Sequence, residues 1–326
     1  MRITRQKLIE LAHQEVAGRA DEDGSLLSAY LIGSVVSADP LLGGKADIDL
    51  VLIHDGWQGP EREVVPLSDD VHLDISHHMR DLYGQPTQLR VDPWLGPALA
   101  EPLILFDPQH FLERVQAGVR GQFYRPDHAA ARGFTFLQRA RQDRRSLDEA
   151  DSWILTYCRS LLEGANAAAC LAGPPASGRG LALDLRQRTG DLGHPEVFHA
   201  FLRLLGADLL PDRDLTRWLE AWELSWRSAS RADARLSPVR RAYYLAGLRA
   251  LAASEQPEVA LWPLLSAWQY ISDHNGGAMP GLPEREALLT HLNLAPAHRP
   301  QRAAELEMFL DTVETIVETW AERNGA

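Results

Sequence analysis

The stretch LLSAYLIGSVVSADPLLGGKADIDLVLIH, residues 26–54, decides the class of fold that this chain predicts. It contains two apolar runs of strand length, joined by a loop rich in glycine, proline and serine. The first run ends at Gly33 and Ser34, and the second begins with Asp47 and Asp49 on either side of an isoleucine. Because side chains two apart in a strand point to the same face of a sheet, we expect both carboxylates to project together.

Two further runs of strand type follow, DVHLDISHHM at residues 70–79 and PLILFDP at residues 102–108. The first of these alternates apolar and polar side chains around a central Asp74. Residues 1–16, MRITRQKLIELAHQEV, have the apolar spacing of an amphipathic helix and lack the apolar core of a signal peptide. A helix followed by short strands predicts a small mixed sheet in this part of the chain.

After Phe111 the pattern becomes helical almost to the end. Apolar residues recur at three- and four-residue spacing in 128–145, 151–172, 194–207, 214–229, 237–254, 258–273 and 301–323. Prolines and glycines mark breaks in this pattern. We therefore predict an α+β chain of two domains, a small mixed β-sheet domain at residues 1–124 and an α-helical bundle domain at residues 125–326.

The composition narrows the classes of function. The net charge is −12 and the pI about 5.5, which argues against a long basic track for nucleic acid. Hydrophobic residues make up 45% and charged residues 24%, and no apolar run reaches bilayer length, so we expect a cytoplasmic protein. Cys158 and Cys170 lie in a helical pattern and are expected to be buried thiols, without a disulfide or zinc role.

One set of residues has a pattern that suits the transfer of a nucleotide to an acceptor: Gly33, Ser34, Asp47, Asp49 and Asp74. Such chemistry must hold a triphosphate, neutralise the charge of departing pyrophosphate and deprotonate a hydroxyl. Magnesium prefers oxygen ligands, and two magnesium ions on Asp47, Asp49 and Asp74 would supply most of the required charge. Gly33 followed by Ser34 at a strand end lets backbone N–H groups approach a phosphate without a Cβ in the way.

Each of these features also has a purely structural interpretation. An Asp-x-Asp pair is common, and a Gly-Ser at a strand end usually marks a turn. Asp74 is also consistent with an edge-strand charge that discourages aggregation. The order of the features favours the functional interpretation: a helix, a strand ending in Gly-Ser, a glycine loop, a strand opening with Asp-x-Asp, and an alternating strand with a central aspartate.

The motifs Gly-Ser, DIDLVLI and LDIS together resemble the signature of the polymerase-β-type nucleotidyltransferase superfamily, over roughly the N-terminal third of the chain. The resemblance implies that Gly33 and Ser34 bind the triphosphate of the co-substrate ATP. It also implies that Asp47 and Asp49 ligate magnesium, present as two ions. For Asp74 it implies either a third metal ligand or the general base, a role that requires a carboxylate within hydrogen-bond reach of the substrate hydroxyl.

A catalytic sheet followed by a helical bundle is similar to the layout of the aminoglycoside nucleotidyltransferases of the streptomycin/spectinomycin and kanamycin types. Residues 152–185, SWILTYCRSLLEGANAAACLAGPPASGRGLALDL, resemble the helical-domain stretch of the streptomycin/spectinomycin enzymes. In that family a lysine of this stretch helps to bind nucleotide, and Arg179 is the nearest counterpart here. From about residue 190 onward, no motif of that family is recognisable.

The resemblance predicts an adenylyltransferase that uses magnesium to transfer AMP from ATP to a hydroxyl of a small, aminoglycoside-like molecule. Two alternatives stay open: transfer to a protein or a tRNA end, as in toxin–antitoxin members of the superfamily, and a nucleotide-binding module without turnover. The expected partners are a nucleoside triphosphate and a small-molecule acceptor, with no membrane and no nucleic acid. The chain is expected to be a monomer or a homodimer.

Other side chains in the pattern have simpler structural interpretations. Arg159 could reach a triphosphate, but an ion pair with another helix or with Glu163 is the simpler prediction. His72, His77 and His78 flank the central aspartate of their strand without zinc-binding spacing. Three tryptophans at four-residue spacing are predicted to form bundle core: Trp218, Trp222 and Trp226.

Overall fold

The computed structural model describes residues 3–36, 41–150, 152–210, 215–229, 233–275 and 279–326. The chain divides into two compact units. The first contains Met1–Tyr124 and Asp233–Tyr243, and the second contains Arg125–Ala232 and Tyr244–Ala326. The segment Asp233–Tyr243, which the sequence pattern assigns to the helical part, therefore belongs to the first unit.

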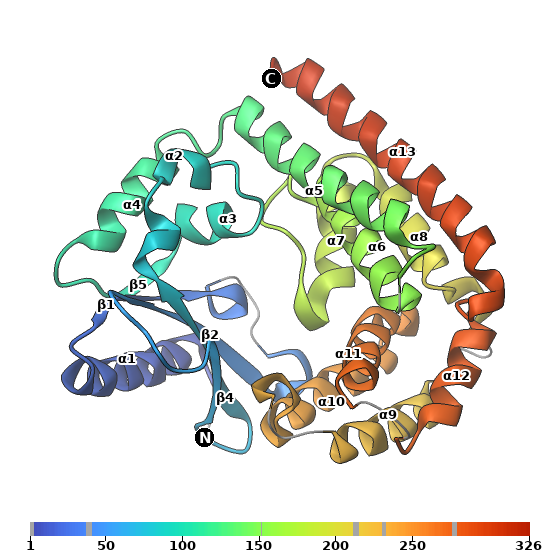
Figure 1. Ribbon diagram of the computed structural model, residues 1–326, viewed down its shortest axis with the longest axis horizontal. Helices are drawn as coiled ribbons and strands as arrows, with labels where there is room; N and C mark the ends of the chain where they lie inside the picture. Colours follow the sequence, from blue (N-terminus) through green and yellow to red (C-terminus); the bar gives the residue numbers. More distant parts are fainter. Residues whose placement is uncertain (1–2, 37–40, 151, 211–214, 230–232, 276–278) are drawn as a thin grey trace. The chain divides into compact units, whose positions relative to one another are not determined.

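A five-stranded mixed sheet forms the centre of the first unit (Figure 1). Its strands are β1 (Leu26–Ile32), β2 (Ala46–His54), β3 (Arg62–Pro66), β4 (Val71–Met79) and β5 (Leu103–Phe106). They lie in the order β3-β4-β2-β1-β5, with β2 and β4 parallel and the other neighbours antiparallel. The predicted α+β class with a mixed sheet is confirmed.

The strand β3 has no counterpart among the predicted strands. Its sequence, Arg-Glu-Val-Val-Pro, does not alternate apolar and polar side chains. It also ends at Pro66, whose nitrogen cannot donate a hydrogen bond to a neighbouring strand. β3 lies at the edge of the sheet and pairs with β4. Its existence follows from that tertiary pairing and not from a local pattern.

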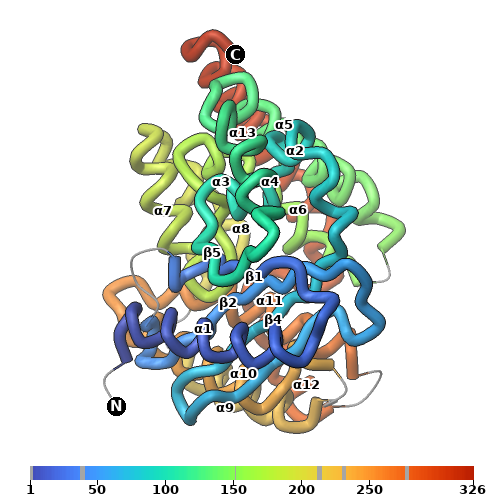
Figure 2. Tube along the Cα trace, turned by 90° about the vertical axis from the view of Figure 1, so that its left-hand side faces the viewer, coloured from blue at the N-terminus to red at the C-terminus, as the bar shows by residue number. Residues whose placement is uncertain are grey.

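The helix α1 (Arg5–Glu22) covers one face of the sheet, and in Figure 2 it lies in front of β1, β2 and β4. The Thr4 side chain caps its N-terminus by accepting a hydrogen bond from the backbone N–H of Lys7 at 3.3 Å. Leu8, Ala12 and Val16 form its buried stripe. They pack in one cluster with the sheet residues Ala29, Leu31, Ile48, Leu50, Leu52, Leu73 and Ile75. Burial of each leucine or isoleucine side chain stabilises the fold by about 1.5–3 kcal/mol.

Three shorter helices cover part of the opposite face of the sheet (Figure 1). They are α2 (Pro86–Leu89), α3 (Leu95–Ala100) and α4 (Phe111–Arg120). Buried side chains of these helices pack with Val51 and Ile53 of β2. Because alternate strand residues share a face, Asp47 and Asp49 lie on this same face, toward the beginning of β2.

The second unit is helical. Its helices are α5 (Pro126–Ser146), α6 (Trp153–Ala169), α7 (Leu181–Asp191), α8 (Pro195–Leu204), α9 (Thr216–Ser228), α11 (Leu261–His274), α12 (Leu282–His291) and α13 (Arg299–Asn324), joined by the later part of α10 (Pro238–Ala252). In Figure 1, α5 and α13 run side by side, and Arg141 of α5 pairs with Glu307 of α13 at 2.5 Å. Among the described residues, no helix has both the length and the apolar character needed to cross a bilayer.

Buried side chains of the second unit confirm several structural predictions. The three tryptophans of α9 are buried, as expected for bundle core. Arg159 of α6 donates hydrogen bonds to both carboxylate oxygens of Asp143 on α5, at 2.5 and 2.6 Å. The predicted interhelical ion pair therefore exists, with Asp143 as its partner. Cys158 and Cys170 are buried free thiols, also as predicted.

A chain of four side chains, here called the histidine chain, lies on the α1 face of the sheet. His54 Nδ1 is 3.1 Å from Asp23 Oδ2, and His54 Nε2 is 2.9 Å from His77 Nδ1. His77 Nε2 is in turn 3.0 Å from Glu63 Oε1. Trp57 stacks on the His77 ring with the ring centroids 4.1 Å apart. Burial lowers the pKa of both histidines, although the two carboxylates act to raise it.

We expect the contribution of the two histidines to the free energy of unfolding to decrease as the pH falls below the ordinary histidine pKa of 6.5. A histidine whose pKa is lowered by folding binds its proton more readily in the unfolded chain, so acid favours unfolding. Asp23, Glu63 and Arg19 are the charged groups that act on the two rings. Urea unfolding, followed by tryptophan fluorescence at about pH 7.5 and about pH 5.5, should show a smaller decrease in the double variant His54→Gln/His77→Gln.

The matched control is His110→Gln, which removes an exposed imidazole from the same unit. We expect this control to retain the pH dependence of the wild type. A double variant with the same pH dependence as the wild type would show that the histidine chain does not set it.

Candidate metal centre

The parallel pairing of β2 and β4 brings three aspartates together. The register of the two strands sets Asp49 directly opposite Asp74, and Asp47 opposite His72. One carboxylate oxygen from each of Asp47, Asp49 and Asp74 lies within 4.8 Å of the other two. The three predicted carboxylates therefore meet on one face of the sheet, and they are called the aspartate trio below.

The aspartate trio concentrates negative charge in a largely buried place. Asp47 is 8% exposed and Asp74 2% exposed, while Asp49 is half-buried. Burial, and next the charge of Asp47, raise the pKa of Asp49 to about 7, while Arg240 and Arg62 act in the opposite direction. Because neighbouring carboxylates resist joint ionisation, a cation bound among them would relieve their repulsion.

Gly33 follows β1 and packs against the side chain of Asp49. The pairing of β1 with β2 sets Ile32 opposite Asp49, so the next residue emerges beside the carboxylate. Gly33 has φ of +72°, in the left-handed region that favours glycine. A Cβ at this position would overlap the Asp49 carboxylate and lie 3.0 Å from its Cγ. Both the backbone and the carboxylate therefore require glycine, and Ser34 follows in the short 3₁₀ helix Gly33–Val35.

Two arginines that the sequence pattern did not single out pair with Asp74. Arg62 of β3 binds both carboxylate oxygens, its Nε donating to Oδ1 at 2.5 Å and its Nη2 donating to Oδ2 at 2.6 Å. Arg240, near the start of α10, pairs with the same Oδ2. Arg62 lies in the unpredicted strand, and Arg240 comes from the segment that returns late in the chain to the first unit. No local signal near Asp74 indicates either residue.

The three histidines of β4 have packing and hydrogen-bonding contacts. His72 shares the face of the aspartate trio, and its ring meets that of Tyr243 edge-on with centroids 5.2 Å apart. His77 points to the opposite face, where it forms part of the histidine chain. His78 Nδ1 is 2.6 Å from the hydroxyl of Tyr83. These contacts agree with the structural roles that the sequence predicts.

Arg179, which the resemblance predicts to bind nucleotide, belongs to the second unit. It lies in the short 3₁₀ helix Gly178–Gly180 and is 5% exposed. Its guanidinium packs against Gly247 of α10, where a Cβ would lie 2.6 Å from Arg179 Nη1. Gly247 thus leaves room for the Arg179 side chain. A nucleotide-binding role for Arg179 stays a prediction.

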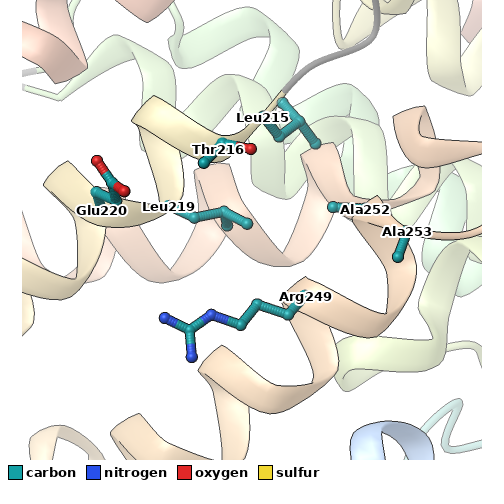
Figure 3. A pocket seen from close by; sticks show the side chains of 7 residues that line it. All are labelled: Leu215, Thr216, Leu219, Glu220, Arg249, Ala252 and Ala253. Atoms are coloured by element: carbon teal, nitrogen blue, oxygen red, sulfur yellow. The ribbon is translucent and has the colours of Figure 1, made fainter.

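The second unit also contains a pocket of about 350 Å³ beside α9 and α10. Figure 3 shows the side chains that line it, with Thr216 and Glu220 on α9 and Arg249 on α10. The lining also includes Leu215, Leu219, Ala252 and Ala253. None of these lining residues is among the predicted site residues, so the pocket adds no part to the predicted metal centre.

Comparison of the sequence with protein-family models and with curated proteins finds no match. The chemistry of the centre therefore follows from its own residues. The aspartate trio offers oxygen donors, the ligand type that magnesium and manganese prefer. Its spacing and its charge fit a divalent cation of this kind.

Proposed function

We propose that this chain is a metal-dependent nucleotidyltransferase that transfers AMP from ATP to a hydroxyl of a small, aminoglycoside-like molecule. The observation that carries the proposal is the compact trio of Asp47, Asp49 and Asp74, with Gly33 packed against Asp49. Clustered carboxylates suit divalent cations, and the absence of a Cβ at Gly33 leaves room for the Asp49 carboxylate beside the turn.

The aspartate trio fits magnesium because its oxygen donors lie close together and carry excess negative charge. Asp47 and Asp49 would hold the metal, and Asp74 would complete the set of ligands. Magnesium, when bound, supplies positive charge that stabilises the reacting phosphate and the departing pyrophosphate. The contribution of the protein is to hold the three carboxylates in place on two paired strands, which are more rigid than loops.

The turn at Gly33 and Ser34 binds phosphate in this proposal. A left-handed residue within a tight turn directs successive backbone N–H groups to one side and creates a concave site for an anion. Gly33 has such a conformation, and the turn begins where β1 ends, beside the Asp49 carboxylate. The triphosphate would therefore lie next to the metal ligands.

In this proposal Asp74 is the third metal ligand, because one of its carboxylate oxygens lies within 4.8 Å of oxygens of Asp47 and Asp49. Both of its oxygens accept hydrogen bonds from the guanidinium of Arg62. In the metal-free protein the guanidinium therefore takes up positions on this carboxylate that a metal ion would use. A charged carboxylate is the form that ligates a metal ion.

Incubation of the full-length protein with magnesium, ATP labelled at the α-phosphate and a panel of aminoglycosides and aminocyclitols tests the proposal. We expect acceptor-dependent release of pyrophosphate and label on the small molecule. Label found only on added protein or tRNA would replace the small-molecule acceptor with a macromolecule. Absence of pyrophosphate release with every common nucleoside triphosphate and every acceptor would reject the proposed activity.

A further inference from the structure

The two arginines that pair with Asp74 differ in exposure. The side chain of Arg62 is 37% exposed, whereas that of Arg240 is 10% exposed and that of Asp74 is 1% exposed. Arg62 therefore forms the solvent side of the ion pair, and Arg240 forms its buried side. Rotation of the Arg62 side chain into solvent would free Oδ1 of Asp74 without moving a buried group, while Arg240 stays paired with Oδ2.

The pairing of the edge strand β3 with β4 places Arg62 close to the aspartate trio. The antiparallel register sets Val64 opposite Asp74 and Arg62 opposite Ser76. Because alternate residues of a strand share a face, Arg62 and Val64 lie on the same face as Asp74. A long side chain two positions away along β3 can thus reach the carboxylate, and its guanidinium meets both oxygens.

The charges around Asp74 are incompletely balanced by the two arginines. Three carboxylates meet two guanidinium groups, so one formal negative charge remains when all three are ionised. Two magnesium ions bring four positive charges, and a nucleoside triphosphate brings about four negative charges at neutral pH. Binding of the two magnesium ions together with the triphosphate therefore leaves the net charge of the site nearly unchanged. Metal ions alone would place excess positive charge beside two arginines.

Arg62 also competes with a metal ion for the same atoms. A carboxylate has about four lone-pair positions, and the two arginines already use both oxygens of Asp74. Magnesium binds oxygen at about 2.0–2.1 Å, a distance that brings it close to any guanidinium on the same carboxylate. The resulting repulsion opposes simultaneous binding of the metal and Arg62.

We propose that Arg62 is an exchangeable counter-ion, which neutralises Asp74 in the metal-free protein and transfers to the phosphates when metal and nucleoside triphosphate bind together. The inference rests on the proposed function of the aspartate trio. Arginine binds phosphate oxygens in the same forked manner as carboxylate oxygens, so the triphosphate offers Arg62 an equivalent partner. Metal alone offers none. Each ligand therefore strengthens the binding of the other, since such coupling is reciprocal.

The test uses the full-length protein and the variant Arg62→Met, which removes the guanidinium and keeps an unbranched apolar side chain. Mn²⁺ alone is titrated and the free ion is measured by electron paramagnetic resonance. Binding of α,β-methylene-ATP with magnesium is measured by calorimetry. We expect Arg62→Met to bind Mn²⁺ about tenfold more tightly and the magnesium–nucleotide analogue about tenfold more weakly than the wild type.

Opposite changes for the two ligands separate counter-ion exchange from structural damage, because a distorted site would bind both more weakly. The matched control is Arg80→Met, which removes an exposed arginine of the same unit, 3.2 Å from Asp55. We expect this control to bind both ligands like the wild type. Mn²⁺ binding by Arg62→Met that is equal to or weaker than that of the wild type would overturn the inference.

The variant Asp47→Asn distinguishes failure of this inference from failure of the proposed function. If Mn²⁺ binding requires Asp47 but does not respond to Arg62→Met, the metal centre stands and the exchange is wrong. If Mn²⁺ binds equally well to Asp47→Asn, or to none of the proteins, the metal centre itself is wrong and the exchange is rejected with it.

Discussion

Replacement of Asp47 or Asp49 by asparagine is expected to abolish nucleotidyl transfer while the protein stays folded. Each substitution keeps the shape of the side chain and removes one negative charge from the aspartate trio. Charge stabilisation by bound metal is worth several kcal/mol in the transition state, and each 1.4 kcal/mol is a factor of ten. We therefore expect kcat/KM to fall by at least about 1000-fold.

The same two variants should unfold no more easily than the wild type. Burial is the first cause of the raised pKa of Asp49 and the charge of Asp47 is the second, so ionised Asp47 and Asp49 repel each other in the metal-free protein. Loss of one carboxylate removes that repulsion, so the urea midpoint should stay constant or rise. Asp55→Asn, which changes an exposed aspartate just after β2, is the matched control for both measurements. Transfer at the wild-type rate by both Asp47→Asn and Asp49→Asn would contradict the proposed function.

Replacement of Gly33 by alanine should give the second largest loss of activity. The new Cβ would overlap the Asp49 carboxylate and displace it from the aspartate trio. Misplacement of a reacting group by about 1 Å can cost about 100-fold in rate, and we expect a loss of that order. The left-handed φ of +72° adds an independent cost to stability of about 1–2 kcal/mol.

Gly44→Ala separates these two effects. Gly44 has φ of +76°, close to that of Gly33, but a Cβ there would meet no atom within 4 Å. Both variants should therefore lose similar stability in urea unfolding, and Gly33→Ala alone should lose about 100-fold in kcat/KM. Equal losses of activity in the two variants would show that backbone strain, and not displacement of Asp49, is the cause.

Local sequence patterns predicted the features whose information lies within one strand or one turn. The two-residue spacing within β2 predicted that Asp47 and Asp49 share a face, and the burial of Leu50 and Leu52 on the other face fixes that orientation. The apolar spacing of residues 1–16 likewise predicted the helix α1. The pairing of the strands could not be predicted from such local patterns, and the register of β2 with β4 brings Asp74 to the other two aspartates.

The arginines at Asp74 could not be predicted from the sequence, because their positions depend on contacts between distant segments. Arg62 lies in a short edge strand whose only ladder partner among the described strands is β4. Arg240 reaches Asp74 because the segment Asp233–Tyr243 packs with the first unit. A carboxylate that is buried and needs a counter-ion predicts that some cation lies nearby, but it does not say which one.

The edge strand β3 has a consequence for how the first unit must assemble. Arg62 and Glu63 are adjacent and point to opposite faces of the sheet. Arg62 pairs with Asp74 of the aspartate trio, and Glu63 pairs with His77 of the histidine chain. A slip of β3 by one residue along β4 would interchange the two, placing a carboxylate against the aspartates and a guanidinium against the histidines. Mispaired chains would thus be penalised electrostatically on both surfaces at once. The register of this five-residue strand is therefore specified by charge on both faces of the sheet as well as by its backbone hydrogen bonds.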